Sequence, residues 1–365
     1  MAKQKKKPKI LPFAQEQMNV VTSDNDNLSE ALKDLVPEKH KGTDKFLDVV
    51  QWNLEWFGAT KSRAKDKLRY DTILTVLEAL NADLFVFQEI AGPSKDGRYP
   101  GALDAVADDL VARDAGDYRV AYSDAGGEQR IAMMWDRDWL RARAEIEDLY
   151  DVGEHKTKDG KDAFARRSPL YGYFASRLPA SGTEDQRYGS DSFDFQVLGL
   201  HLKAMEDGHE QRLKSADVLA GWLSKEAPTI DADVIMVGDW NAPPNDACWK
   251  PIHDLEKKPN PDVHFSDIND PDEFSYLWLR NKSTKFVSRI DLAAISSASM
   301  RKAVDGEASK VILWKPIEEA LKIAGDLTDK EVVNVLSIIK EHVSDHLPTV
   351  TRFYFTDQDP VPARQ

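Results

Sequence analysis

Residues 234–244 read Val-Ile-Met-Val-Gly-Asp-Trp-Asn-Ala-Pro-Pro. Four apolar residues are followed by Gly238 and then by two polar residues, Asp239 and Asn241. A short apolar run that ends at turn residues is typical of a buried central strand. Because residues i and i+2 of an extended chain face the same side, we expect Asp239 and Asn241 to project together from the end of the strand. A carboxylate beside a carboxamide can orient and deprotonate a water molecule, although this sequence also suits an ordinary turn.

Five other motifs place polar residues next to apolar runs. They are Trp52-Asn53-Leu54-Glu55-Trp56, Phe87-Gln88-Glu89, Leu200-His201-Leu202-Lys203, Arg289-Ile290-Asp291 and Ser344-Asp345-His346-Leu347-Pro348. In this order and spacing, the six motifs resemble those of the endonuclease/exonuclease/phosphatase superfamily, whose fold is that of pancreatic deoxyribonuclease. The resemblance covers about residues 45–355. It implies a four-layer α/β/β/α sandwich, in which two mixed sheets pack face to face with helices outside.

The hydrophobic pattern is consistent with that α/β architecture. It predicts strands at 46–53, 84–89, 118–123, 130–135, 144–150, 168–176, 193–200, 234–237, 274–279, 287–295 and 348–355. It predicts helices at 29–35, 66–80, 103–113, 210–224, 316–324 and 328–340, the last with a capping box of Thr328 and Glu331. We therefore expect a Lys-rich tail at 1–44, one catalytic domain at 45–357 with a helical insertion at about 304–343, and a short tail at 358–365.

Composition narrows the class of protein. The chain has 365 residues, with 63 acidic and 49 basic side chains and a net charge of −14. That balance argues against a general binder of polyanions, but it says nothing about how charge is distributed. The single cysteine, Cys248, excludes an internal disulfide framework. Since no secretory signal or membrane-length apolar run is present, we expect a cytoplasmic protein that does not bind membranes.

The polar residues of the motifs favour a hard metal ion. Oxygen ligands are abundant and no cluster of Cys and His is present, so Mg²⁺ is favoured over Zn²⁺, with Mn²⁺ as the alternative. We expect Asn53, Glu89 and Asp345 to bind the metal, with Glu89 and Asn53 as the direct pair that the resemblance also implies. Because Mg²⁺ in proteins usually binds phosphate oxygens as well, phosphate is the expected substrate group.

The resemblance also implies catalytic residues. They are His201, Asp239, Asn241, Asp291, His346, Glu128 and Arg167. In this interpretation, Glu128 pairs with His201 and Asp291 pairs with His346, which fixes each imidazole. Arg167, or Arg166 if the strand is shifted by one residue, faces the phosphate. Asp239 deprotonates a water molecule for in-line attack, while the metal, the histidines and the arginine stabilise the phosphoryl oxygens.

These residues predict a Mg²⁺-dependent DNA endonuclease. The presence of His201, where abasic-site endonucleases have Tyr, argues against that branch. Ala125-Gly126-Gly127 replaces a phosphate-contacting Tyr of the deoxyribonuclease branch.

The alternatives to a DNA endonuclease are a phosphatase or phosphodiesterase for a small phosphorylated molecule or lipid head group, and a non-catalytic scaffold. A cytoplasmic nuclease would need restraint, for example by a regulatory protein partner. Five aromatic residues could line a groove or stack on bases, Trp240 foremost: Trp56, Phe57, Trp240, Tyr276 and Trp278.

Overall fold

The strands of the computed structural model form two large sheets and a hairpin. The structure describes residues 32–59, 67–94, 100–177, 193–256, 263–264, 269–270, 273–280, 283–324, 327 and 330–355. The first sheet has the order β14 (Lys310–Val311), β15 (Thr349–Phe353), β1 (Leu47–Phe57), β2 (Leu84–Ile90), β4 (Arg130–Asp136), β3 (Tyr118–Tyr122). The second has the order β10 (Val263–His264), β13 (Asp291–Ser296), β9 (Val234–Asp239), β8 (Asp194–His201), β7 (Leu170–Ser176), β5 (Leu140–Ala142), and β6 (Glu147–Asp148) also pairs with β7. The hairpin is β11 (Tyr276–Arg280) and β12 (Ser283–Ser288).

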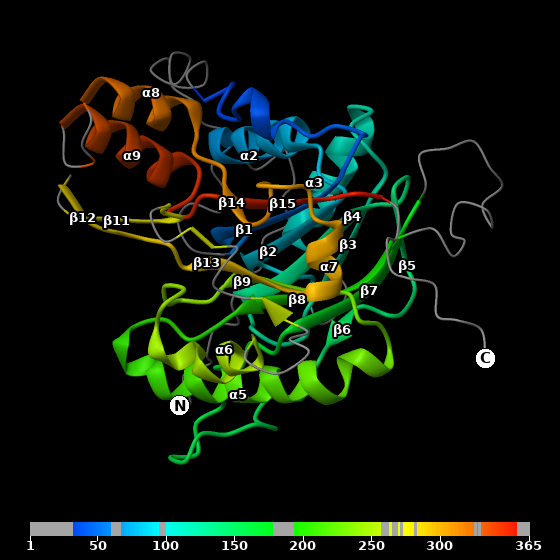
Figure 1. Ribbon diagram of the computed structural model, residues 1–365. Coiled ribbons are helices and arrows are strands. Elements are labelled where there is room, and N and C mark those ends of the chain that lie inside the picture. Colours follow the sequence, from blue (N-terminus) through cyan, green and yellow to red (C-terminus); the bar gives the residue numbers. More distant parts are fainter. Residues whose placement is uncertain are drawn as a thin grey trace, which may run out of the picture.

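Helices cover the outer face of each sheet (Figure 1). The first sheet is covered by α2 (Lys67–Leu80), α3 (Ala102–Ala112), α8 (Lys315–Ala324) and α9 (Lys330–His342). The second is covered by α5 (His209–Lys225) and α6 (Lys250–Glu256). The remaining helical segments are short: η2 (Glu38–His40), η3 (Glu206–Gly208), η4 (Ala227–Thr229), η5 (Ala247–Trp249) and α7 (Ser297–Lys302). None of the described helices is both long and apolar enough to cross a membrane.

Three apolar clusters hold these layers together. On β1, Val49 faces the other sheet, while Val50 and Trp52 pack under the helices. The strand alternates in this way because successive side chains point to opposite faces. The cluster between the sheets contains residues from both, among them Val86, Phe174, Phe195, Val237 and Phe353. Two buried sheets between two helical layers confirm the four-layer sandwich expected from the sequence.

Each sheet contains one parallel pair near its centre, β1 with β2 and β8 with β9. Parallel neighbours bring their carboxyl ends to the same edge of a sheet, where open α/β sheets place ligands. Asn53 and Glu89 lie towards this edge of the first sheet, and His201 and Asp239 end their strands in the second. The fold therefore brings four of the predicted site residues towards one edge.

The predicted strand at 287–295 is wrong in one informative respect. The structure has two strands there, β12 and β13, separated by Arg289 and Ile290. Arg289 is buried, and its guanidinium bonds to the Ser309 carbonyl at 2.6 Å and to Glu273 at 3.1 Å. This break starts β13 at Asp291. The other corrections are smaller. The predicted strand at 144–150 forms only the two-residue strand β6, and strand β5 was not predicted. Of the helix predicted at 29–35, residues 32–35 are not helical.

Residues 304–343, predicted as a helical insertion, contain strand β14 of the first sheet as well as α8 and α9. The two helices lie side by side and pack near the β11–β12 hairpin (Figure 1). Val332, Leu336 and Ile339 of α9 are buried in the cluster that covers the first sheet. Thr328 of the expected capping box lies outside the described residues. Lys340 Nζ at the end of α9 lies 3.5 Å from Asp345 Oδ2, so the insertion reaches the candidate site.

Candidate active site

The candidate residues meet at the ends of strands from both sheets. In the second sheet, His201 pairs with Asp239, which pairs with Asp291. Directly paired residues point to the same face of a sheet, so these three side chains share one face. From the first sheet, Asn53 Nδ2 donates a hydrogen bond to Asp239 Oδ2 at 3.1 Å. This hydrogen bond joins the two sheets at the site.

Gly238 allows β9 to approach β8 closely just before Asp239. Its φ is 152°, and an added Cβ would lie 2.1 Å from the carbonyl oxygen of Leu200. Because the atom it would meet is backbone, no side-chain rotation relieves the clash. We expect Gly238→Ala to lower the free energy of unfolding by about 2 to 3 kcal/mol, measured by urea denaturation.

Gly221→Ala in α5 is the matched control, because an added Cβ there meets nothing within 4 Å. Alanine favours helix over glycine, so this control should keep or raise stability. Equal stability of Gly238→Ala and the wild type would contradict the close approach of the two strands.

His346 is held by a buried carboxylate of the second sheet. Its Nδ1 lies 2.8 Å from Asp291 Oδ2, and its Nε2 lies 4.0 Å from Asp239 Oδ2 and 3.9 Å from Asp345 Oδ1. Burial alone would lower the pKa of His346. The attraction and hydrogen bond of Asp291, with the other two carboxylates, instead raise that pKa well above its ordinary value. The imidazole is therefore cationic at neutral pH, and the expected pair with Asp291 is formed.

Sequence reasoning missed Gln51, which holds Asp291 from its other oxygen. Gln51 Nε2 donates to Asp291 Oδ1 at 2.8 Å and to Gln88 Oε1 at 2.7 Å. Its Oε1 accepts a hydrogen bond from Thr349 Oγ1 at 3.1 Å. A glutamine within an apolar strand was the available signal, because buried polar side chains require hydrogen-bond partners.

Asp239 lies among these charges and is itself buried. Its Oδ1 accepts a hydrogen bond from the Asn241 backbone N–H at 2.9 Å. Burial raises the pKa of Asp239; the nearby negative charges of Asp291 and Glu89 raise it further, against the opposing effect of His346. A carboxylate with a raised pKa is better suited to accept a proton near neutral pH.

The extended backbone on which the alignment of Asn241 and Asp239 was predicted ends at Asp239. Asn241 has a φ of 57°, so the chain is no longer extended there and the i, i+2 rule does not apply. Its Nδ2 donates to the carbonyl of Leu202 at 3.0 Å. Asn241 therefore holds Asp239 through its backbone, and asparagine suits this position because it tolerates the left-handed conformation.

His201 contacts an arginine. Arg167 Nη1 lies 3.0 Å from His201 Nε2, and Arg167 Nη2 donates to the Leu202 carbonyl at 2.8 Å. A guanidinium has no acceptor, so Nε2 accepts and Nδ1 carries the proton. Burial, followed by the charges of Arg167 and His346, lowers the pKa of His201 well below its ordinary value. The site thus combines one neutral histidine with one cationic histidine.

The structure does not form the expected pair of Glu128 and His201. Nδ1 of His201 makes no hydrogen bond with any residue that the structure describes. Glu128 belongs to a turn that begins at Gly126, whose φ is 94°. The next residue, Gln129, is the one that reaches this side, and its Oε1 lies 3.5 Å from Arg167 Nη1. Neighbouring side chains of a turn point in different directions. A motif that matches in sequence therefore does not show which of its side chains reaches His201.

The predicted metal ligands offer oxygen atoms to a cation. The side chains of Glu89 and Asp345 are each 14% exposed, so a small ion can reach them. Glu89 Oε2 is buried and makes no hydrogen bond with a described residue, an unfavourable state for a carboxylate unless a cation or water binds it. Glu89 also has a φ of 61°, a strained conformation of the kind found at functional sites. This donor set fits Mg²⁺ or Mn²⁺.

The aromatic residues expected near the site differ in exposure. The rings of Tyr276 and His346 lie 4.8 Å apart between centroids. Burial and the nearby carboxylates raise the pKa of Tyr276, so its hydroxyl stays protonated. Trp240, in contrast, is fully buried and packs edge-on against Trp249. The expectation that Trp240 stacks on a substrate is therefore wrong, because its side chain belongs to the core.

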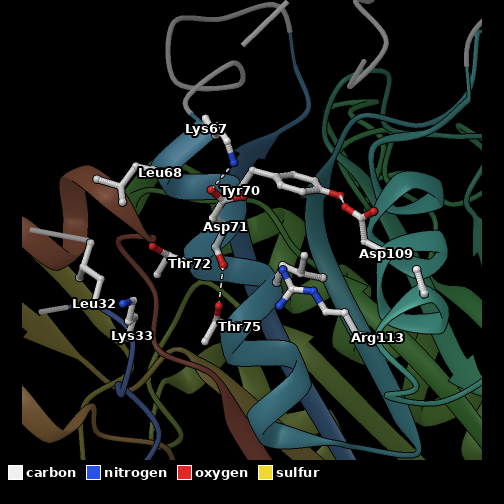
Figure 2. Close-up of a pocket in the computed structure, with 12 residues that line it drawn as sticks. Leu32, Lys33, Lys67, Leu68, Tyr70, Asp71, Thr72, Thr75, Asp109 and Arg113 are labelled. Atoms are coloured by element: carbon white, nitrogen blue, oxygen red, sulfur yellow. Dashed lines mark hydrogen bonds and ion pairs between the residues drawn. The ribbon is translucent and has the colours of Figure 1, made fainter. Parts of the chain in front are cut away.

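A cavity of about 520 Å³ lies between α2, α3 and residues 32–33 (Figure 2). None of the candidate residues lines it. Its polar groups bond to one another: the Tyr70 hydroxyl donates to Asp109 Oδ2 at 2.7 Å, and Lys67 pairs with Asp71. These four polar groups already have partners within the lining, and the cavity is separate from the candidate active site.

A second acidic and histidine cluster lies outside the site. The side chains of His209, Asp246 and Cys248 have potential ligand atoms within 4.8 Å of one another. Burial and the Asp246 carboxylate raise the pKa of the Cys248 thiol, and the positive charge of Arg212 lies beside it. A protonated thiol next to a guanidinium disfavours a cation, so this cluster is a weaker metal candidate than Glu89.

No protein-family model matches the chain, and no curated protein matches it in sequence. Its structure, however, resembles solved structures. An endonuclease/exonuclease/phosphatase family protein from Bacteroides thetaiotaomicron aligns with a TM-score of 0.50 at 15% identity, over 88% of this chain and 98% of that one. The chain has the endonuclease/exonuclease/phosphatase fold.

Two further solved structures match at a TM-score of 0.48 and 15% identity. One is a humanized TDP2 of D. rerio, covering 85% of this chain and 99% of that chain. The other is the mannosyl-6-phosphatase Bt3783 of B. thetaiotaomicron VPI-5482, covering 84% and 98%. The match to the Bacteroides thetaiotaomicron family protein, at a TM-score of 0.50, confirms the resemblance identified from the six motifs at the level of the fold.

Proposed function

We propose that this chain is a Mg²⁺-dependent phosphodiesterase that acts as an endonuclease on DNA. One arrangement carries the proposal: buried Asp239 lies between cationic His346 and neutral His201, beside Glu89. Hydrolysis of a phosphodiester requires a proton acceptor for water, positive charge at the phosphoryl oxygens and, in this class of site, a divalent cation. The chain supplies the first two and ligands for the third.

Each side chain has a distinct role in this proposal. Asp239, held by the Asn241 N–H, accepts a proton from the attacking water as the water oxygen bonds to phosphorus. The bond between phosphorus and the leaving oxygen breaks in the same in-line displacement, and water protonates that oxygen. His346, fixed by Asp291, stabilises the negative charge on the phosphoryl oxygens. Arg167 adds a second positive charge and holds His201 in one tautomer.

Glu89, Asn53 and Asp345 would hold the cation. A bound Mg²⁺ neutralises phosphate charge and lowers the pKa of water in its coordination shell. The buried, unbonded Oε2 of Glu89 is the observation that supports this assignment.

Supercoiled plasmid tests this function directly. We expect the purified chain to nick plasmid DNA in Mg²⁺ or Mn²⁺, and cleavage to stop when EDTA exceeds the metal. Glu89→Gln should reduce the cleavage rate at least about tenfold, because a neutral amide is a poorer metal ligand. Glu145→Gln, an exposed glutamate outside the site, is the matched control and should be fully active.

Each of the other outcomes would contradict a different part of the proposed function. Activity that survives Glu89→Gln would exclude the proposed metal site. Intact plasmid together with hydrolysis of a small phosphoester would favour the small-molecule phosphatase alternative. Plasmid cleavage that is indifferent to EDTA would exclude a metal-dependent reaction.

A further inference from the structure

A groove of about 1110 Å³ opens beside the candidate active site. It is lined by residues of the turn at 124–130 and of the loop at 152–167, together with Lys203 and Gln211. Within that loop, a backbone bridge joins Lys156 to Asp162. Pockets for small ligands usually measure about 300 to 1,000 Å³. The groove therefore has room for a longer ligand than a single phosphoester.

The groove is basic although the protein is acidic. Two acidic side chains line it, Asp124 and Asp162, against six basic ones: Arg130, Lys156, Lys161, Arg166, Arg167 and Lys203. Over the whole chain, acidic residues outnumber basic ones, 63 to 49. Asp162 is also engaged by the backbone, since its two carboxylate oxygens accept hydrogen bonds from Phe164 N and Gly153 N at 2.9 and 2.8 Å. The local charge of the groove is therefore positive.

Several of these charges are available to a ligand. Within the described part of the chain, Lys156, Arg166 and Lys203 form no ion pair with a carboxylate. Lys156 and Arg166 are also exposed. Gly127 and Gly160 line the same groove, and an added Cβ at either would meet nothing within 4 Å. The groove thus has positive side chains without a carboxylate partner next to two glycines that have open space around them.

Arg167 connects the groove to the candidate active site. Its guanidinium lines the groove and bonds to His201 Nε2 at 3.0 Å. Lys203, which also lines the groove, follows His201 by two residues. A chain with one phosphate at Asp239 can therefore continue past Arg167 between the two loops. The lining residues include no aromatic side chain, so this surface contacts phosphates and does not stack on bases.

We propose that this groove binds the nucleic-acid strand adjoining the scissile phosphate, through its backbone phosphates. The inference rests on the proposed phosphodiesterase function and names the substrate as a polymer. It also explains how a protein with a net charge of −14 can bind a polyanion. The contacts depend on charge and not on base identity, so binding is independent of sequence and sensitive to salt.

Binding of a fluorescein-labelled 20-nucleotide oligomer, measured by anisotropy in EDTA, separates binding from cleavage. We expect Lys156→Gln/Arg166→Gln to weaken binding about tenfold at low salt. Loss of two phosphate contacts should also reduce the slope of log affinity against log salt by about 1.4 for a single strand and about 1.8 for a duplex. The kcat/KM for bis(p-nitrophenyl) phosphate should not change, because that diester does not reach the groove.

Arg119→Gln/Lys225→Gln is the matched control, since both residues are exposed and neither lines the groove. It should bind as the wild type does. Parallel DNA and RNA oligomers of one sequence show which polymer is preferred. Equal binding by the groove variant and the wild type, or no binding by the wild type, overturns the groove inference. A wild-type protein that binds the oligomer through these residues but hydrolyses no phosphodiester overturns the proposed function alone.

Discussion

Asp239→Asn is expected to reduce kcat for plasmid cleavage about a thousandfold and to have a much smaller effect on stability. Asparagine has the same shape but cannot accept the proton of the attacking water, and general-base catalysis contributes roughly a hundredfold to ten-thousandfold. Two effects on stability oppose each other. Removing the buried charge, which burial disfavours, stabilises the fold, whereas Asn has one acceptor oxygen for the two hydrogen bonds that Asp239 accepts, which costs about 1 to 3 kcal/mol. Urea denaturation and initial cleavage rates measure the two properties separately.

Asp233→Asn, immediately before the same strand, provides the opposite control. Asp233 lies just before β9 and forms a fully buried ion pair with Lys302. Removing one partner of a buried pair costs about 3 to 5 kcal/mol, because the other charge remains buried. We expect Asp233→Asn to lose stability but to keep its activity per folded molecule. Full activity of Asp239→Asn would exclude Asp239 as the proton acceptor.

Asp291→Asn is expected to reduce kcat about a thousandfold by releasing His346. The carboxylate at 2.8 Å fixes the imidazole and keeps it charged. His346→Gln should cause a similar loss. The double variant should be no worse than either single one, because both substitutions disable the same unit. Losses that multiply in the double variant would show that the two residues act independently.

Asp291→Asn should also change how the activity depends on pH. In the wild type the pKa of His346 is raised well above its usual value of about 6.5, so the imidazole remains cationic as pH rises through that value. Asparagine at position 291 removes the largest attraction that raises this pKa. The variant should therefore lose the cation, and its residual activity, at a lower pH than the wild type does. Parallel pH profiles of the two proteins would contradict this role for Asp291.

Local sequence pattern was sufficient to find most residues of the site. Buried strands are apolar, so a polar residue at the end of such a run stands out, as Asp239 and Glu89 do. The order of the six motifs then indicated the superfamily fold, and the structure places Asn53, His201, Asp291 and His346 around Asp239. Strand periodicity indicated where these residues lie, and the resemblance of the six motifs to the superfamily implied their roles.

Tertiary structure alone decided three other matters. The direction of side chains in the turn at Gly126 determines that Gln129 reaches Arg167 and that Glu128 does not contact His201. Packing against Trp249 buries Trp240, which the sequence pattern suggested for substrate contact. The charge state of each histidine depends on neighbours more than thirty residues away in the chain.

The distribution of charge shows most clearly what the sequence determines and what only the tertiary structure decides. The acidic composition is a property of the sequence and argues against polyanion binding. The basic groove arises because the turn at 124–130, the loop at 152–167 and Lys203 fold into contact, while most acidic residues lie elsewhere. Composition sums charges over the whole chain, whereas electrostatic attraction falls with distance and is screened within about 10 Å in salt. A ligand therefore responds to the charges that folding brings near it.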